Sequence, residues 1–397
     1  MNILYHHRTQ GKGGEGVHIR EIVMALESLG HKVFVVSPPG VNALEDVASD
    51  KAVKKSCIFA NLWRFIGKYT PQIIFEIFEI VYNLYAYNKL SKVLKREKID
   101  FIYERYAFFL FAGVNLSKKY HIPIILEVNE TSGLKRERGQ VLISLAENIE
   151  KMVFQKANFL LPVTSFLKQE IIRKGVDQEK IFVQPNAINL DSFTGMNSCD
   201  ELRRRFAIRG KTILGFVGHF SRWDSLLTLL DIFEQLRLLN KDVHLLIIGD
   251  GKLRKELENA VAEKKMNDFV TFSGKVSRGS IKNYVGLIDI AVIPNQSIFG
   301  SPLVMFEFMA MGKAIVAPDA TGVTDVLVDN ISCRVFKLGD FEALKNVLIE
   351  LIDAPQKRKM LGDAARDIVF VKHRWVGNAG RIINIYNNLK KEIIYAA

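Results

Sequence analysis

The sequence has little of what a secreted or membrane-spanning protein needs. Its three cysteines, Cys57, Cys199 and Cys333, lie far apart and have no histidines at metal-ligand spacing, so neither a disulfide framework nor a zinc site is indicated. No run of 18 uncharged apolar residues occurs, as a transmembrane helix would require. The first residues are typical of a strand and not of a basic-then-apolar leader. We therefore expect a cytoplasmic protein and leave open a peripheral contact with the inner face of the membrane.

Three kinds of motif are missing, and each absence disfavours one class of ligand. No Asp-x-Asp pair occurs, so no carboxylate pair is placed to bridge Mg²⁺ to a diphosphate, and we expect no metal and no other cofactor. The glycine-rich segment at residues 11–16 is not Gly-x-Gly-x-x-Gly, and no acidic residue ends the second predicted strand, which disfavours a nicotinamide cofactor. Basic residues are scattered in ones and twos without a finger or RNP-like motif, so we expect no nucleic-acid partner.

Size and charge set the remaining expectations. A chain of 397 residues with 48% hydrophobic content is too long for one ordinary core and has ample apolar residues for two. The net charge of +12 favours anionic partners, namely sugar nucleotides, nucleic acid or an acidic lipid surface. Charge alone does not choose among these three.

Apolar strands alternate with helical stretches in two series, which predicts two doubly wound parallel sheets. The pattern resets around residues 185–193, so we predict one domain over residues 1–188, joined by a C-terminal helix at 375–397, and a second over 189–374. In the first series we expect strands at 2–6, 32–36, 101–103, 122–128 and 159–163, with helices at 17–29, 110–120 and 144–157. In the second we expect strands at 212–217, 244–248, 270–273, 290–293 and 314–317, with helices at 226–239, 253–264 and 303–311.

Two segments have the composition of anion-binding sites. The loop at residues 11–16 lies between a strand and a helix, where glycines let the backbone approach a ligand and the helix start favours an anion; a tight turn without a ligand is the alternative. Farther on, Gly300-Ser301-Pro302 opens an apolar helix. Free amides at its start could accept a diphosphate, and Glu307, about one turn in, could accept hydrogen bonds from sugar hydroxyls. A glutamate on the surface is the alternative there.

Five motifs in order resemble glycosyltransferase family 4. They are the N-terminal Gly-Gly loop, Val217-Gly218, Ile-Gly-Asp-Gly at 248–251, Phe-Ser-Gly-Lys-Val at 272–276, and Gly-Ser-Pro-Leu followed by Phe-Glu-Phe-Met-Ala-Met-Gly-Lys at 300–313. The opening Tyr-His-His-Arg and the Tyr-Glu-Arg-Tyr at 103–106 resemble the corresponding segments of a subgroup of this family. That subgroup is found in bacterial gene clusters for surface polysaccharides. The resemblance implies a GT-B fold, with two Rossmann-like domains facing each other across a cleft. It also implies retaining, metal-independent transfer from a UDP- or GDP-linked sugar to a lipid-linked or polysaccharide acceptor.

The same resemblance implies roles for individual residues. Glu307 would hold the ribose hydroxyls, and Lys275 and Val276 would frame the base with their backbone. Amides at the start of the last motif would contact the diphosphate. The full donor-binding set is Gly13, Gly14, Gly218, Lys275, Val276, Ser301, Leu303, Val304 and Glu307. Asn129, after a predicted strand, is the candidate for positioning the reacting sugar, with a turn-capping role as the alternative.

The sequence also departs from the family pattern. Two positions that usually carry cations hold His219 and Asp224, and a carboxylate aimed at a diphosphate would oppose the reaction. We therefore take Arg222 as the source of the missing charge and count His219 and Arg222 with Asn129 as catalytic candidates. Phe299 replaces the first glutamate of a pair, and Val304 stands where relatives often carry lysine. A catalytically silent protein that binds a glycan or a partner, and a sugar-nucleotide epimerase, remain alternatives.

Residues 51–98 interleave lysines and arginines with aromatic side chains, a mixture suited to an anionic membrane surface. Within them, Glu76, Glu79 and Asn83 form a polar stripe on a predicted helix at 73–87. An acidic face is wrong for an anionic surface. We therefore expect this helix to pack in the first domain and only its flanks to be candidates for membrane contact.

Overall fold

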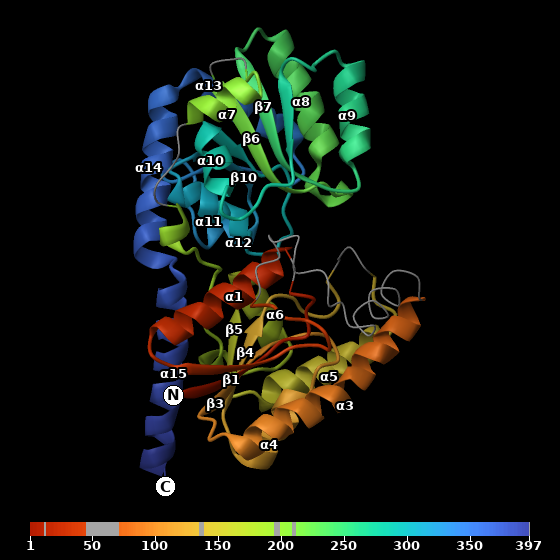
Figure 1. The fold of residues 1–397 in the computed structure, drawn as a ribbon, viewed down its shortest axis with the longest axis vertical. Coiled ribbons are helices and arrows are strands. Elements are labelled where there is room, and N and C mark those ends of the chain that lie inside the picture. The colour runs from red at the N-terminus through yellow and green to blue at the C-terminus, as the bar shows by residue number, and fades with distance from the viewer. Residues whose placement is uncertain (12, 45–70, 135–138, 194–198, 209–211, 397) are drawn as a thin grey trace. The chain divides into compact units, whose positions relative to one another are not determined.

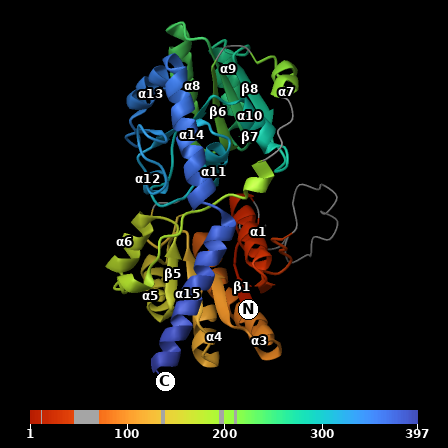
Figure 2. The ribbon, with the colours of Figure 1, turned by 90° about the vertical axis from the view of Figure 1, so that its left-hand side faces the viewer.

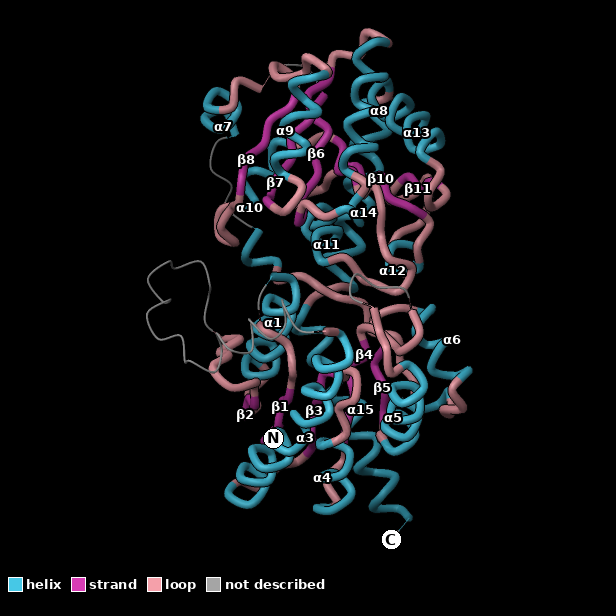
Figure 3. The backbone as a smooth tube through the Cα atoms, turned by 90° about the vertical axis from the view of Figure 1, so that its right-hand side faces the viewer, coloured by secondary structure: helices cyan, strands magenta, loops and turns pink. Residues whose placement is uncertain are grey.

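The computed structural model describes residues 1–11, 13–44, 71–134, 139–193, 199–208 and 212–396. Contacts divide the chain into two compact units. Unit 1 comprises Met1–Pro185 with Trp375–Ala397, and unit 2 comprises Asn186–Arg374. The boundary predicted from the sequence, between residues 188 and 189, lies in the same connecting stretch. Each unit contains one all-parallel sheet between helices (Figure 3), so the predicted class of two Rossmann-like α/β domains is confirmed.

Unit 1 is built on a five-stranded sheet in the order β2-β1-β3-β4-β5. Its strands are β1 (Asn2–His6), β2 (Lys32–Val36), β3 (Phe101–Arg105), β4 (Ile124–Val128) and β5 (Phe159–Pro162). Every residue of β3 and β4 is buried, as expected for strands covered on both faces. The order reverses between β1 and β3, and such a switch point is where ligands bind outside the carboxyl ends of parallel strands.

Helices cover both faces of this sheet. α3 (Gln72–Arg96), α4 (Ala112–Tyr120) and α5 (Ile143–Lys156) share one apolar core with the strands. α1 (Gly13–Ser28) and α15 (Trp375–Ala396) lie together on the other face (Figures 1 and 2). There Tyr386 of α15 stacks on Phe101 of β3 with ring centroids 4.8 Å apart, and this contact fixes the C-terminal helix to unit 1. α6 (Ser165–Arg173) follows β5.

Unit 2 is built on a six-stranded sheet in the order β11-β10-β9-β6-β7-β8. One apolar core lies on each face of this sheet. The strands are β6 (Thr212–His219), β7 (Val243–Asp250), β8 (Val270–Gly274), β9 (Ile290–Val292), β10 (Ala314–Pro318) and β11 (Arg334–Phe336). The helices are α7 (Cys199–Arg205), α8 (Leu226–Leu238), α9 (Arg254–Glu263), α10 (Ile281–Leu287), α11 (Leu303–Ala310), α12 (Thr321–Thr324), α13 (Phe341–Asp353) and α14 (Pro355–Lys372).

Two local expectations need correction. The helix expected to start at residue 17 starts at Gly13, so Gly13 and Gly14 belong to its first turn and not to a preceding loop. Helix α3 extends to Arg96, and its polar stripe faces inward. Glu76 is fully buried and Asn83 is nearly so, which means that the opposite face of the helix meets solvent.

Asn83 explains why this stripe is polar. Its side-chain amide donates to the carbonyl of Phe109 at 2.7 Å. Its Oδ1 accepts from the backbone amides of Phe111 and Ala112, at 2.8 and 3.0 Å. These are amides at the start of α4, which have no carbonyl partner within their own helix. Asn83 therefore caps a neighbouring helix from the middle of α3.

We predict that Asn83→Ala lowers the free energy of unfolding by about 2–4 kcal/mol, because two buried backbone amides lose their acceptor. Chemical denaturation followed by circular dichroism measures the change. Asn88→Ala on the exposed face of the same helix is the matched control and should change stability by less than about 0.5 kcal/mol. Equal stabilities of the two variants would contradict this role for Asn83.

Candidate functional site

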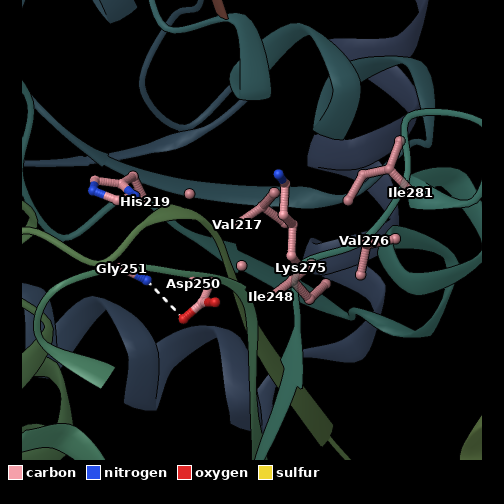
Figure 4. Close-up of a pocket in the computed structure, with 10 residues that line it drawn as sticks. Val217, His219, Ile248, Asp250, Gly251, Lys275, Val276 and Ile281 are labelled. Carbon is pink, nitrogen blue, oxygen red and sulfur yellow. Dashed lines mark hydrogen bonds between the residues drawn. The ribbon is translucent and has the colours of Figure 1, made fainter. Parts of the chain in front are cut away.

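A pocket of about 520 Å³ opens in unit 2 where β6 and β7 end and the chain leaves β8 (Figure 4). This is the carboxyl edge of the sheet, the usual place for ligands in parallel α/β domains. Four residues predicted from the sequence lie together here, namely Gly218, His219, Lys275 and Val276. The remaining lining residues are Val217, Ile248, Gly249, Asp250, Gly251 and Ile281.

Two glycines allow the backbone segments at this edge of the sheet to pack closely. Gly249 has a φ of +132°, and a Cβ there would lie 1.9 Å from the carbonyl oxygen of Gly218. A Cβ on Gly251 would lie 2.5 Å from the backbone nitrogen of Phe220, whose ring is fully buried. Side chains at these positions would push the ends of β6 and β7 apart. The Ile-Gly-Asp-Gly motif therefore shapes the pocket through its backbone.

Charged and titratable side chains reach the pocket from three segments. His219 and Lys275 are exposed, and so is Asp250, whose Oδ1 accepts from the amide of Gly251 at 2.9 Å (Figure 4). The role of Asp250 could not be assigned from the sequence, where it appears only as part of a motif. One wall of the pocket is thus acidic and another basic, a combination able to orient a polar, charged ligand.

Glu307 lies on α11, close to the helix start. It is 4% exposed, so the alternative of a surface glutamate is wrong. Arg278 contacts the Glu307 carboxylate through its guanidinium. Burial raises the pKa of Glu307, and the charge and hydrogen bond of Arg278 act against that rise. A carboxylate buried in this way needs such a partner.

Arg278 also connects Glu307 with the pocket. It lies three residues after Lys275 and two after Val276, on the loop that lines the pocket. The guanidinium is about one third exposed, so it can turn toward water or toward an anion. Sequence reasoning missed this residue. The only available signal was an arginine closely following the Phe-Ser-Gly-Lys-Val motif.

The turn before α11 is held by internal hydrogen bonds. Ser301 accepts from the backbone amide of Asn186 through its hydroxyl, at 3.1 Å, and from the Asn186 side chain through its carbonyl, at 2.6 Å. Leu303 and Val304 are the first two residues of the helix, so their amides have no carbonyl one turn earlier. Ser301 fixes the turn from which these two amides project, and they remain the candidates to meet a diphosphate.

Asp224, one of the departures from the family pattern, lies in the loop after β6, together with Arg222. Asp224 accepts from the hydroxyl of Ser221 at 2.5 Å and from its amide at 3.1 Å, closing a short 3-10 turn over Arg222–Asp224. Its carboxylate therefore caps this turn. Arg222 is exposed and forms no ion pair with another described residue.

Unit 1 contains a buried polar cluster at the carboxyl ends of β3 and β4. Glu127 is 2% exposed and accepts from the hydroxyl of Tyr103 at 3.1 Å. His18 of α1 contacts the same carboxylate at 2.7 Å, and Arg105 contacts its other oxygen. Burial raises the pKa of Glu127, but the coulombic attraction of His18 and Arg105 outweighs burial and holds the pKa below its usual value.

Asn129 belongs to this cluster. Its side-chain amide donates at 2.6 Å to Glu127, two residues earlier in the chain, and Glu127 in turn contacts His18 and Arg105. A separate contact joins two motifs of the sequence on the other face of β3, where Glu104 in Tyr-Glu-Arg-Tyr contacts His6 of the opening segment at 2.5 Å. Gly13 and Gly14, the other unit 1 candidates, are exposed in the first turn of α1.

Comparison with known proteins agrees with these features. Residues 12–192 match the family described as Glycosyltransferase Family 4, and residues 199–368 match the one described as Glycosyl transferases group 1. The chain belongs to glycosyltransferase family 4. The resemblance carried by the five motifs is thereby confirmed, and so is the prediction of an enzyme that uses a nucleotide sugar.

Individual relatives of this glycosyltransferase are distant. An uncharacterised glycosyltransferase of Methanocaldococcus jannaschii is 22% identical over 387 residues, which is 95% of each chain. The lipopolysaccharide 1,2-N-acetylglucosaminetransferase of Salmonella typhimurium is 26% identical over 51% of this chain and 55% of its own. An Anabaena protein solved in complex with UDP covers all of both chains with a TM-score of 0.68 and 16% identity. This last similarity supports the fold.

Proposed function

We propose that this glycosyltransferase performs retaining, metal-independent transfer of a sugar from a UDP- or GDP-linked donor to a lipid-linked or polysaccharide acceptor in bacterial cell-surface glycan synthesis. The donor binds unit 2, with its base against the backbone of Lys275 and Val276 and its ribose on Glu307. The amides of Leu303 and Val304 receive the diphosphate. Asn129 positions the reacting sugar from unit 1, with Gly13 and Gly14 contributing backbone contacts to the phosphates.

The observation that carries the donor part of the proposal is the environment of Glu307. A carboxylate that is buried beside a partly exposed arginine can accept hydrogen bonds from ribose hydroxyls when that arginine turns toward solvent, because the hydroxyls then supply the donors that a buried carboxylate needs. Arg278, the partner of this carboxylate, lies in the chain two residues after Val276, which lines a pocket of nucleotide size. The relative solved with UDP supports a nucleotide at such a site.

The acceptor part of the proposal is supported by the Salmonella relative, whose name assigns it a lipopolysaccharide acceptor. The alternative of a catalytically silent protein rested on the departures at His219, Asp224, Phe299 and Val304. Asp224 has a structural role, because it caps the short turn through Ser221, and the activity measurements below separate an active enzyme from a silent one.

We predict that Glu307→Ala weakens UDP or GDP binding by about 100-fold or more, the effect of losing two hydrogen bonds to a charged acceptor. Isothermal calorimetry measures the affinity, and thermal unfolding checks that the variant is folded. Glu256→Ala, which removes an exposed glutamate of α9, is the matched control. Unchanged affinity of Glu307→Ala for both nucleotides would remove Glu307 from the site.

Metal independence gives a second prediction. Because the sequence has no Asp-x-Asp pair to hold Mg²⁺ at a diphosphate, turnover or donor hydrolysis should persist at an unchanged rate in excess chelator. The release of nucleoside diphosphate in a panel of UDP- and GDP-sugars measures this rate. A reaction that stops in chelator and returns with added Mg²⁺ would contradict the prediction.

The third prediction concerns the charge that stabilises the departing diphosphate. If Arg222 supplies it, Arg222→Ala lowers turnover by about 100-fold, the scale of losing one preorganised donor in a transition state. Arg204→Ala on α7, also exposed, is the control and should retain activity. Full activity of Arg222→Ala would assign the charge to another residue. Lys12, in the glycine-rich segment at residues 11–16, is then the next residue to test, and it lies outside the described residues.

A further inference from the structure

The solvent face of α3 is apolar along the first half of the helix. Ile73, Ile77, Val81 and Leu84 follow one another at intervals of three and four residues and therefore lie on one side of the helix. Their side chains are 44%, 48%, 49% and 69% exposed, respectively. Four large apolar side chains aligned on one exposed face are unusual for a helix that has only solvent beside it.

The segment that leads into α5 also exposes apolar side chains. Val141, Ile143 and Leu145 are between 42% and 54% exposed. The backbone amides of Val141 and Leu142 donate to the buried carboxylate of Glu76, at 2.8 and 2.7 Å, which ties this segment to the first half of α3. We call the exposed side of α3 that carries Ile73, Ile77, Val81 and Leu84 the α3 face.

Beyond Leu84 the same side of α3 becomes basic. Asn88, Lys92 and Lys95 continue the helical spacing, and all three are exposed. Lys118 and Lys119, which end the adjoining helix α4, are exposed as well. Lys119 bonds the hydroxyl of Tyr87 on α3 at 3.2 Å. One end of the α3 face is therefore apolar and the other carries a cluster of lysines.

The acidic groups of α3 point the other way. Glu76 is fully buried, and Glu79 contacts Arg8 within unit 1. The helix packs in unit 1 as expected, and its acidic stripe is the inner face and not the side that meets solvent. Glu147 of α5 is the one exposed carboxylate in the first turn and a half of that helix, at residues 143–147.

We propose that the α3 face docks this enzyme on a lipid bilayer containing anionic headgroups. Amphipathic helices bind such bilayers by burying their apolar side chains at the boundary of headgroups and acyl chains, while lysines reach the phosphates. A second copy of the chain fits less well, because it would have to meet these lysines with carboxylates, and those of α3 face inward. Among the described residues no helix is long and apolar enough to cross a membrane, so the contact is peripheral.

The inference extends the proposed function, since an acceptor carried on a lipid would be presented at the same surface. It does not depend on the donor site. Docking is measured on the full chain without nucleotide or acceptor, by co-sedimentation with phosphatidylglycerol-rich vesicles and with pure phosphatidylcholine vesicles. We expect binding to the anionic vesicles that weakens as salt is added.

Two pairs of substitutions test the two halves of the α3 face. Ile77→Ser with Leu84→Ser should lower vesicle partitioning at least about 10-fold through lost apolar burial. Lys92→Gln with Lys95→Gln should lower it by a similar factor, about five-fold for each lysine, and only on the anionic vesicles. Leu238→Ser with Val371→Ser, at exposed apolar positions in unit 2, is the matched control and should bind like the wild type.

Three outcomes would overturn the proposal. The first is that the wild type does not bind vesicles, and the second is that the α3 variants bind them as well as the control does. The third is a dimer in sedimentation that Ile77→Ser with Leu84→Ser dissociates, because that result would assign the face to a second copy of the chain. Nucleotide affinity of the folded α3 variants should equal that of the wild type. A loss of donor binding therefore tests the proposed function, and a loss of vesicle binding tests the α3 face.

Discussion

A buried carboxylate is costly unless charged or polar groups surround it, and in each unit of this glycosyltransferase one such carboxylate lies among the candidate site residues. In unit 1, Glu127 joins α1, β3 and β4 through His18, Arg105 and Tyr103, and it also holds Asn129. In unit 2, Glu307 has Arg278 as its charged partner. Glu127 is held by several groups and is suited to positioning. Among the described residues Glu307 has one charged partner, a partly exposed arginine, and is suited to exchanging it for a ligand.

The fold could be predicted from the sequence because local signals agreed with tertiary structure. Continuous apolar runs such as β4 and β7 indicate strands buried on both faces, and the intervening helical periodicity indicates crossover connections. The Ile-Gly-Asp-Gly motif entered only through the family resemblance, and the structure supplies its physical reason, because a Cβ on Gly249 would meet the carbonyl oxygen of Gly218. Family resemblance added the identity of the chain and the choice of Glu307.

Side-chain partners could not be predicted in the same way. The sequence gives no sign that Arg278 meets Glu307, 29 residues away, or that Asp224 turns back onto Ser221. The polar stripe of α3 is the clearest case. Periodicity identified its members, but polar residues normally face solvent, and only the amides of α4 and of residues 141–142 explain why Asn83 and Glu76 face inward. Such long-range hydrogen bonds leave no periodic signal.

The central claim is that unit 2 holds the donor nucleotide through Glu307 and the loop at 275–278. A crystal structure of the enzyme with UDP or GDP bound tests it most directly. The account predicts ribose hydroxyls within hydrogen-bonding distance of the Glu307 carboxylate, Arg278 turned away from it, and the base against Lys275 and Val276. A nucleotide bound elsewhere, with the contact between Arg278 and Glu307 unchanged, would contradict the account.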